Sequence, residues 1–122
     1  MLAEAETNLA SLGDAPEAEG RMRLALASAE RALGQGASAR VHLERTLALS
    51  LAHPGFSWRD SARCLELLAE LALEDGDGAA ALAHAGRRTR LASAEEGQDS
   101  EDARMAREFE EGVRQRLGDE QE

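Results

Sequence analysis

Apolar residues recur along the chain every three or four positions, and clusters of glycine and proline interrupt this pattern at short intervals. A spacing of this kind predicts amphipathic helices separated by turns. The interruptions lie at residues 13–16, 34–36, 53–55, 76–78 and 97–100 and at Gly118. The pattern therefore predicts six helices, over residues 2–12, 16–33, 37–52, 58–74, 79–94 and 100–117.

Three of these helices carry a clear apolar face. The faces consist of Leu2, Ala5, Leu9 and Leu12 in the first helix, of Leu65, Leu68, Ala69, Ala72 and Leu73 in the fourth, and of Met105, Phe109 and Val113 in the last. Glu66, Glu70 and Glu74 lie opposite the apolar face of the fourth helix, which indicates a solvated side. Asp14 and Ser57 are the expected N-caps. Since the connecting loops are short, we expect antiparallel packing in a single domain over 1–118, followed by an acidic tail at 119–122.

Composition supports a fold without strands. Of the 122 residues, 25 are alanine and 18 are leucine, whereas valine and isoleucine together number two and only three residues are aromatic. Alanine and leucine are strong helix formers, and a pleated sheet draws on β-branched and aromatic side chains. The composition therefore predicts an all-α fold.

Charge and hydropathy exclude several functions. The formal net charge of −10 argues against nucleic acid as a partner, because an acidic surface repels phosphate. No stretch approaches the roughly 20 apolar residues that a bilayer-spanning helix needs, so we expect no membrane contact. The segment after Met1 does not resemble a secretion signal, which predicts a cytoplasmic location. A single cysteine, Cys64, excludes an internal disulfide.

The sequence also repeats itself at an offset of 42 residues. Residues 34–42 align with residues 76–84, and both segments contain a Gly-x-Gly-Ala turn and end in histidine. The match extends to Ala27 over Ala69 and to Leu49 over Leu91. A helix pair that recurs at a fixed distance is typical of an α-solenoid, in which each hairpin packs against its neighbours.

The second copy of this repeat resembles the tetratricopeptide repeat (TPR). The residues that fill the positions of that motif are Leu65, Leu68, Ala69, Ala72, Gly76, Asp77 and Ala81. Small side chains at Ala69 and Ala81 allow the two helices to approach closely, and Gly76 suits the left-handed C-cap of the first helix. The resemblance implies a short TPR-like α-solenoid of antiparallel hairpins, of the variety with longer helices.

The repeats depart from the TPR pattern at four positions. In the first copy, Leu26, Ala27, Gly34, Ala39 and Leu43 fit, whereas Arg23 and Glu30 stand where apolar residues are usual. In the second copy, Ala85 and Arg88 replace a larger apolar residue and a small one. Segments 58–72 and 113–118 are similar to the C-terminal repeats of bacterial signal-transduction ATPases and regulators of the LuxR and AfsR type. That similarity implies an interaction role in regulation, because the chain has no Gly-Lys-Ser/Thr phosphate loop.

The candidates for chemistry are weak. Residues 74–78 resemble a calcium loop, but His84 would stand where such a loop needs a bidentate glutamate, so a helix–helix turn is the better interpretation. His42, His53 and His84 do not show the spacing of a zinc helix, and Cys64 is expected to be a buried structural thiol. We therefore expect no enzyme, and no catalytic, cofactor or metal site.

Two surface clusters admit both a structural and a binding interpretation. The basic segment 87–90 is expected to compensate neighbouring acidic faces, with docking of an acidic partner as the alternative. Phe56 and Trp58 are expected to fill the gap between hairpins, and a binding hot spot is the alternative.

We expect a protein–protein interaction module, a scaffold or adaptor with a concave groove that binds a segment of another protein. If the TPR register holds, the groove is lined by Arg21, Leu24, Ser28, Arg31, Arg63, Glu66, Glu70 and Leu73. A homodimer is the main alternative, with contacts through Leu2, Leu9 and Leu12 at one end and Met105, Phe109 and Val113 at the other. A small hydrolase or metal enzyme is a remote third hypothesis.

Overall fold

The computed structural model describes the backbone of residues 15–121 and the side chains of residues 15–118. Five helices make up this part: α2 (Pro16–Ala32), α3 (Gly36–Ala52), α4 (Trp58–Glu74), α5 (Gly78–Glu96) and α6 (Glu101–Gln121). No strand occurs within residues 15–121, so the all-α fold class is confirmed for this part of the chain. The predicted helix over 2–12 and the predicted N-cap Asp14 lie outside the described residues.

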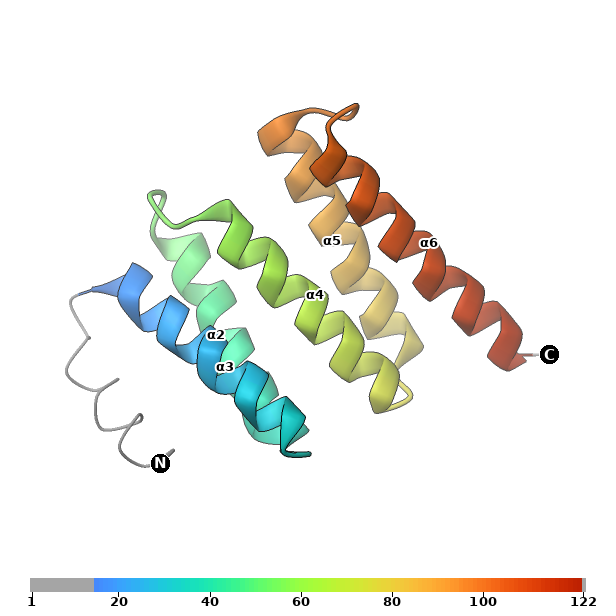
Figure 1. Cartoon of the computed structure of the whole chain (residues 1–122), viewed down its shortest axis with the longest axis horizontal. Coiled ribbons are helices and arrows are strands. Elements are labelled where there is room, and N and C mark those ends of the chain that lie inside the picture. Colours follow the sequence, from blue (N-terminus) through green and yellow to red (C-terminus); the bar gives the residue numbers. More distant parts are fainter. Residues whose placement is uncertain (1–14, 122) are drawn as a thin grey trace. The chain divides into compact units, whose positions relative to one another are not determined.

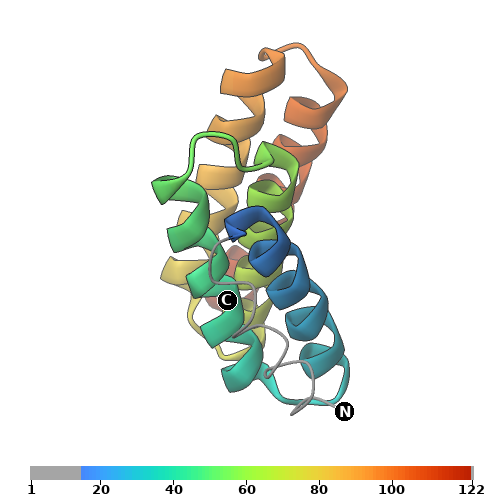
Figure 2. The same cartoon turned by 90° about the vertical axis from the view of Figure 1, so that its left-hand side faces the viewer.

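The chain divides into two compact units, Met1–Cys64 and Leu65–Glu122. In the first unit, α2 and α3 pack side by side as an antiparallel hairpin, joined by a short turn (Figures 1 and 2). In the second unit, α5 and α6 also pack side by side as an antiparallel hairpin (Figure 1). The boundary falls within α4, whose first turns belong to the first unit and whose remainder belongs to the second.

The helix boundaries agree with the predicted ones to within two residues for α2 to α5. The prediction for α6 is wrong at its end, because this helix passes through Gly118 and continues to Gln121. Gly118 does not have a positive φ, so it stays within the helix at a cost of only about 1 kcal/mol relative to alanine. Residues 119–121 of the predicted acidic tail are therefore helical.

The helices recur with the offset of the sequence repeat. The helices α2 and α4 begin at positions 16 and 58, and α3 and α5 begin at positions 36 and 78, in both cases 42 residues apart. The turns after α2 and α4 are also the same. Gly34 and Gly76 have φ values of 77° and 78°, in the left-handed region that glycine adopts without strain.

Both turns form the same pair of capping hydrogen bonds. After α2, the N–H groups of Gly34 and Gln35 donate to the carbonyls of Arg31 and Glu30, at 3.1 and 2.8 Å. After α4, the N–H groups of Gly76 and Asp77 donate in the same way to Leu73 and Ala72, also at 3.1 and 2.8 Å. This arrangement is the Schellman motif, in which glycine ends a helix and its last carbonyls are satisfied. The predicted left-handed cap at Gly76 is confirmed.

The core of the first unit includes Leu26 and Ala27 of α2 and Ala39 and Leu43 of α3, which are all at most 7% exposed. Further residues enter from the segment between α3 and α4. The ring of Phe56 lies over Gly20, and a Cβ on Gly20 would come within 2.6 Å of Phe56 Cε2. Glycine at position 20 therefore allows the aromatic side chain to be buried.

The core of the second unit is built mainly from alanine. Its buried cluster consists of Ala69, Ala72, Ala81, Ala85 and Val113, with Leu73, Ala80, Leu82, Phe109 and Leu117 packed against it. Ala69 and Ala81 are 0% exposed, as the close approach of two helices through small residues predicts. Gly78 serves the same end, because a Cβ there would come within 2.6 Å of Leu117 Cδ2.

Candidate functional site

The predicted groove residues form two equivalent stripes. Arg21, Leu24, Ser28 and Arg31 follow one another on α2 at the spacing of a helix face, and Arg63, Glu66, Glu70 and Leu73 occupy the positions 42 residues later on α4. On α2, Arg21 and Ser28 are exposed, whereas Leu24 and Arg31 are half-buried. The Ser28 hydroxyl donates to the Leu24 carbonyl at 3.1 Å.

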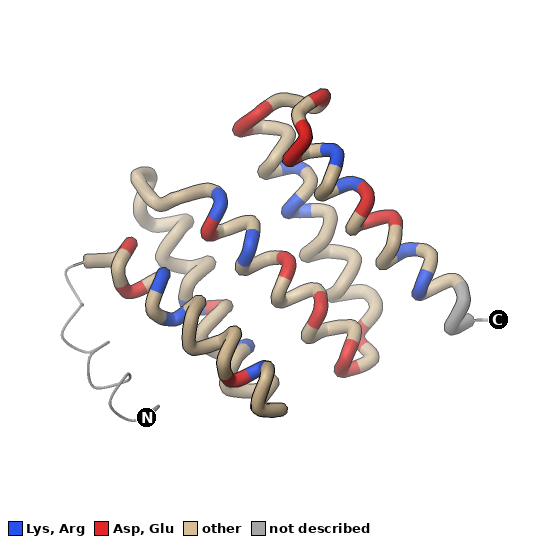
Figure 3. Tube along the Cα trace, in the orientation of Figure 1, with Lys and Arg blue, Asp and Glu red and all other residues tan. Residues whose placement is uncertain are grey.

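The α4 stripe is less exposed than the α2 stripe. Arg63 is exposed, while Glu66, Glu70 and Leu73 are half-buried. Glu66 was predicted to lie on a solvated face, but it is partly buried, because its Oε2 lies 3.4 Å from Nη2 of Arg88 and its side chain is only 19% exposed. Figure 3 shows basic residues only in the first half of α4, where an acidic residue lies between them, and acidic residues along its second half, so this helix carries both charges.

Arg88 links three helices of the second unit. Besides its ion pair with Glu66 of α4, its guanidinium carbon lies 5.2 Å from the centroid of the Phe109 ring on α6. The predicted charge compensation by segment 87–90 is therefore confirmed for Arg88. Arg87 and Arg90 are exposed, and neither forms an ion pair with a described carboxylate.

The two aromatic candidates differ in exposure. Phe56 is only 8% exposed, and its contact with Gly20 accounts for its burial within the first unit. Trp58 is half-buried, and the guanidinium carbon of Arg59 lies 4.5 Å from its ring centroid. Ser57, the predicted N-cap of α4, accepts a hydrogen bond from the N–H of Asp60 at 3.4 Å. Phe56 thus has a packing role, while Trp58 keeps an accessible part.

The residues singled out for chemistry lie in structural positions. The Cys64 thiol is 0% exposed and donates to the carbonyl of Leu43 at 3.0 Å, as expected of a structural thiol. Within segment 74–78, Asp77 is the N-cap of α5, and its Oδ1 accepts from the N–H of Ala80 at 3.1 Å. Within residues 15–118, no three side chains of His, Cys, Asp or Glu form a group that could hold a metal ion.

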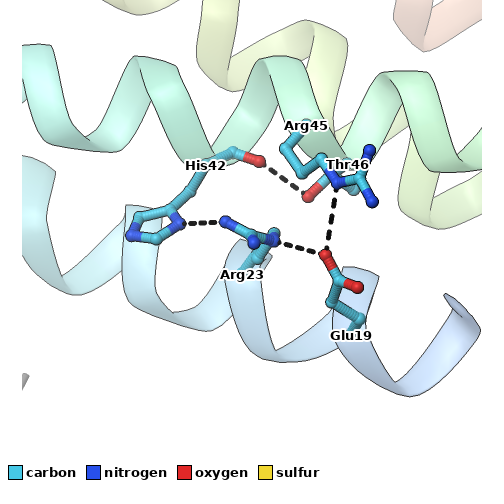
Figure 4. A network of polar contacts seen from close by, with 5 residues as sticks. All are labelled: Glu19, Arg23, His42, Arg45 and Thr46. Carbon is cyan, nitrogen blue, oxygen red and sulfur yellow. Dashed lines mark hydrogen bonds and ion pairs between the residues drawn. The ribbon is translucent and has the colours of Figure 1, made fainter. Parts of the chain in front are cut away.

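A partly buried polar network joins α2 and α3, and the sequence analysis did not predict it (Figure 4). Nε of Arg23 donates to Oε2 of Glu19 at 2.7 Å, and Nη1 of Arg23 lies 2.9 Å from Nδ1 of His42. Nε2 of His42 lies 3.4 Å from Oε1 of Glu30. Arg45 adds a second contact to Glu19 Oε2, also at 3.4 Å.

Burial and the neighbouring arginines act in opposite directions on the pKa of Glu19. Glu19 and Glu30 are only 6% and 4% exposed. Burial by itself would raise the pKa of Glu19, but the hydrogen bonds and charges of Arg23 and Arg45 outweigh it and lower this pKa below 4.5. Glu19 is therefore an ionised carboxylate at neutral pH, held between two arginines.

Two signals in the sequence point toward this network. Glu19 and Arg23 stand four residues apart, the spacing of a helical ion pair. Arg23 and Glu30 are also the two positions at which the first repeat departs from the apolar pattern, and both side chains belong to the network. Their partners on α3 could not be identified without the tertiary structure.

Two of the residues predicted to form a dimer contact pack inside the second unit instead. Val113 is 3% exposed and belongs to the buried cluster, and Phe109 packs against that cluster. Met105 is 50% exposed. The prediction that Val113 supplies a surface contact is therefore wrong, while Leu2, Leu9 and Leu12 lie outside the described residues.

No family of known proteins, no curated protein and no solved structure matches this chain. Among the helices of the described part, none combines the length and the apolar character that crossing a bilayer requires.

Proposed function

We propose that this protein is a protein–protein interaction module, built from TPR-like hairpins as a short α-solenoid, that binds a segment of another protein. The binding surface consists of the α2 stripe and the α4 stripe, defined above by their eight residues. The similarity of segments 58–72 and 113–118 to repeats of bacterial regulators favours a role as a scaffold or adaptor in signal transduction.

The recurrence of one structural unit is the observation that carries this proposal. The helices α2 and α4 are related by an offset of 42 residues, and so are the helices α3 and α5 and the two Schellman turns. Repeat architectures of this kind expose long helix faces that are well suited to binding extended or helical segments. The equivalent position of the two stripes within the repeat supports a shared use for them.

The chemistry of the stripes indicates the type of partner. Arg21, Arg31 and Arg63 supply positive charge, Glu66 and Glu70 supply negative charge, and Leu24 and Leu73 supply apolar surface. A segment that carries both charges around an apolar residue would complement them. Since exposed ion pairs are screened by salt, binding should weaken as the ionic strength rises.

Photo-crosslinking from the α2 stripe tests the proposal. A photoreactive amino acid at Ser28 should capture a partner from the native cell extract, whereas the same amino acid at Ser38, an exposed residue of α3 in the same unit, should not. Equal capture from both positions would contradict the proposed surface. Failure of both to capture any protein would contradict the interaction module.

A further inference from the structure

The α3 helix presents an apolar stripe to solvent. Two of the four exposed large apolar residues in the described part of the chain lie on this helix, Val41 and Leu51, which are 63% and 77% exposed. Ala37, Ala48 and Ala52 are exposed as well. At 3.6 residues per turn, positions 37, 41, 48 and 52 lie within an arc of about 60°. These four side chains therefore share one face of α3, the α3 stripe, and Leu51 lies at its edge.

The equivalent face of α5 is not apolar. The residues that stand 42 positions after Val41, Ala48 and Leu51 are alanine, arginine and serine, at positions 83, 90 and 93. Arg90 is exposed. The repeat therefore does not require apolar residues at these exposed positions, and the α3 stripe is a feature of the first repeat. Contiguous exposed apolar surface commonly marks a site of association.

The order of residues along the α3 stripe is symmetric about the point between Glu44 and Arg45. Val41 and Ala48 lie equally far from this point, on opposite sides of it. When two copies of a helix pack antiparallel about a two-fold axis, residues that lie equally far from the axis on opposite sides meet. An axis through this point would therefore bring Val41 of each copy onto Ala48 of the other copy.

The ends of the α3 stripe match in the same way. Ala37 and Ala52 are also equally far from the axis, so each would meet the other in the second copy. Small side chains at these positions and at Ala48 allow the two helices to approach closely. Leu51 would add apolar contact beside Ala37 of the second copy. The apolar residues of one α3 are thus suited to cover those of another α3.

Charges balance at the centre of this arrangement. Each copy contributes the carboxylate of Glu44 and the guanidinium of Arg45, and both residues are exposed. The Arg45 side chain remains 53% exposed although its Nε lies 3.4 Å from Oε2 of Glu19. The four charges around the axis sum to zero and can pair between the copies. On α5 the equivalent residues are Gly86 and Arg87, so the same arrangement would bring arginines together without a carboxylate of α5.

We propose that the α3 stripe is a self-association surface, on which two copies of this chain form an antiparallel, two-fold symmetric helix pair. A helix of 17 residues is about 25 Å long, so this contact buries less than the roughly 1,600 Å² of a standard interface. The dimer is therefore weak, with a dissociation constant in the micromolar range. A photoreactive amino acid at Ser38, beside the stripe, could capture only a second copy and no segment of another protein, so this proposal and the proposed partner surface fail independently.

Analytical ultracentrifugation of the full chain, at protein concentrations from about 1 to about 500 μM, tests the proposal. The measurement is made at about 0.15 M salt, which screens the repulsion between two chains of net charge −10. We expect a monomer–dimer equilibrium. A chain that stays monomeric over this range would overturn the proposal and would leave a different protein as the occupant of the α3 stripe.

A matched pair of variants locates the contact. Ala48→Arg should raise the dissociation constant at least about tenfold, because it adds a cation beside Arg45 in each copy and removes the small side chain that meets Val41. Ala83→Arg makes the same change at an exposed alanine of α5, at the position equivalent to Val41, and should leave the dissociation constant unaltered. Equal effects of the two variants, or no effect of Ala48→Arg, would overturn the proposal.

Cysteine cross-linking tests the position of the two-fold axis. A mixture of Val41→Cys and Ala48→Cys should form an intermolecular disulfide, because these positions meet across the axis. Val41→Cys alone should not, since position 41 of one copy lies about 10 Å along the helices from position 41 of the other, beyond the reach of a disulfide. The native Cys64 is 0% exposed and does not compete. Cross-linking of Val41→Cys with itself as fast as in the mixture would overturn the proposal.

Discussion

The ring of Phe56 occupies the space that a side chain on Gly20 would need, since a Cβ there would come within 2.6 Å of Phe56 Cε2. Gly20→Ala should therefore lower the free energy of unfolding by about 1–3 kcal/mol, the usual cost of overpacking. Gly112→Ala is the matched control, because a Cβ at this helical position meets nothing within 4 Å. It should raise stability by about 0.5–1 kcal/mol. Urea unfolding followed by circular dichroism measures both, and equal effects would contradict the contact.

The two Schellman turns should respond alike to substitution. Gly34→Ala and Gly76→Ala each place a side chain at a φ near +78°, which should cost about 1–2 kcal/mol. Gly118→Ala, at a helical glycine, should instead be neutral or stabilising. Thermal unfolding of the three variants is the measurement. A loss at Gly118→Ala as large as at the two turns would argue against the caps.

The contribution of Glu19 should depend on pH with a definite sign. Above about pH 4.5 the carboxylate is ionised in both folded and unfolded states, and Glu19→Gln should cost about 1.5–3 kcal/mol through the lost charge-assisted hydrogen bonds. Because the folded pKa is lowered, this difference should shrink as the pH falls through that pKa. Urea unfolding at a series of pH values checks it. If the stability difference between the unaltered protein and Glu19→Gln grew as the pH fell, it would contradict a lowered pKa for Glu19.

Arg88 should stabilise the second unit through Phe109 as well as Glu66. Arg88→Ala should cost about 1 kcal/mol. A double-mutant cycle with Phe109→Leu should give a coupling energy of about 0.5–1 kcal/mol. Arg87→Ala removes an exposed arginine from the same helix and should stay within about 0.5 kcal/mol of the unaltered protein. A coupling energy near zero would show that Arg88 stabilises the second unit only through its ion pair with Glu66.

The helices could be predicted from the sequence because their signals are local. Apolar spacing, Pro16 and the glycines at positions 34 and 76 act within a few residues, and the helices and turns lie where these residues indicate. The end of α6 could not be predicted in this way. A glycine close to the end of a helix can either cap it or continue it, and Gly118 continues it.

The candidate site was predictable only in part. A helix spacing places Arg21, Leu24, Ser28 and Arg31 on one face, but burial decides how much of each is accessible. Glu66 was expected in solvent and instead pairs with Arg88, which lies 22 residues further along the chain. Arg23 and Glu30 lie on α2, and their partner His42 lies on α3. The repeat pattern could therefore mark Arg23 and Glu30 as polar exceptions, but it could not identify His42 as their partner.

The most direct test of the proposed function is the affinity of charge-reversed variants for the segment captured from position 28. Arg31→Glu and Arg63→Glu should each weaken binding about tenfold at low salt, with a smaller effect at high salt, because both remove positive charge from the stripes. Arg87→Glu makes the same change in net charge at an exposed arginine of α5 and should leave the affinity unaltered. Unaltered binding by both stripe variants, or equal weakening by all three, would contradict a partner surface on α2 and α4.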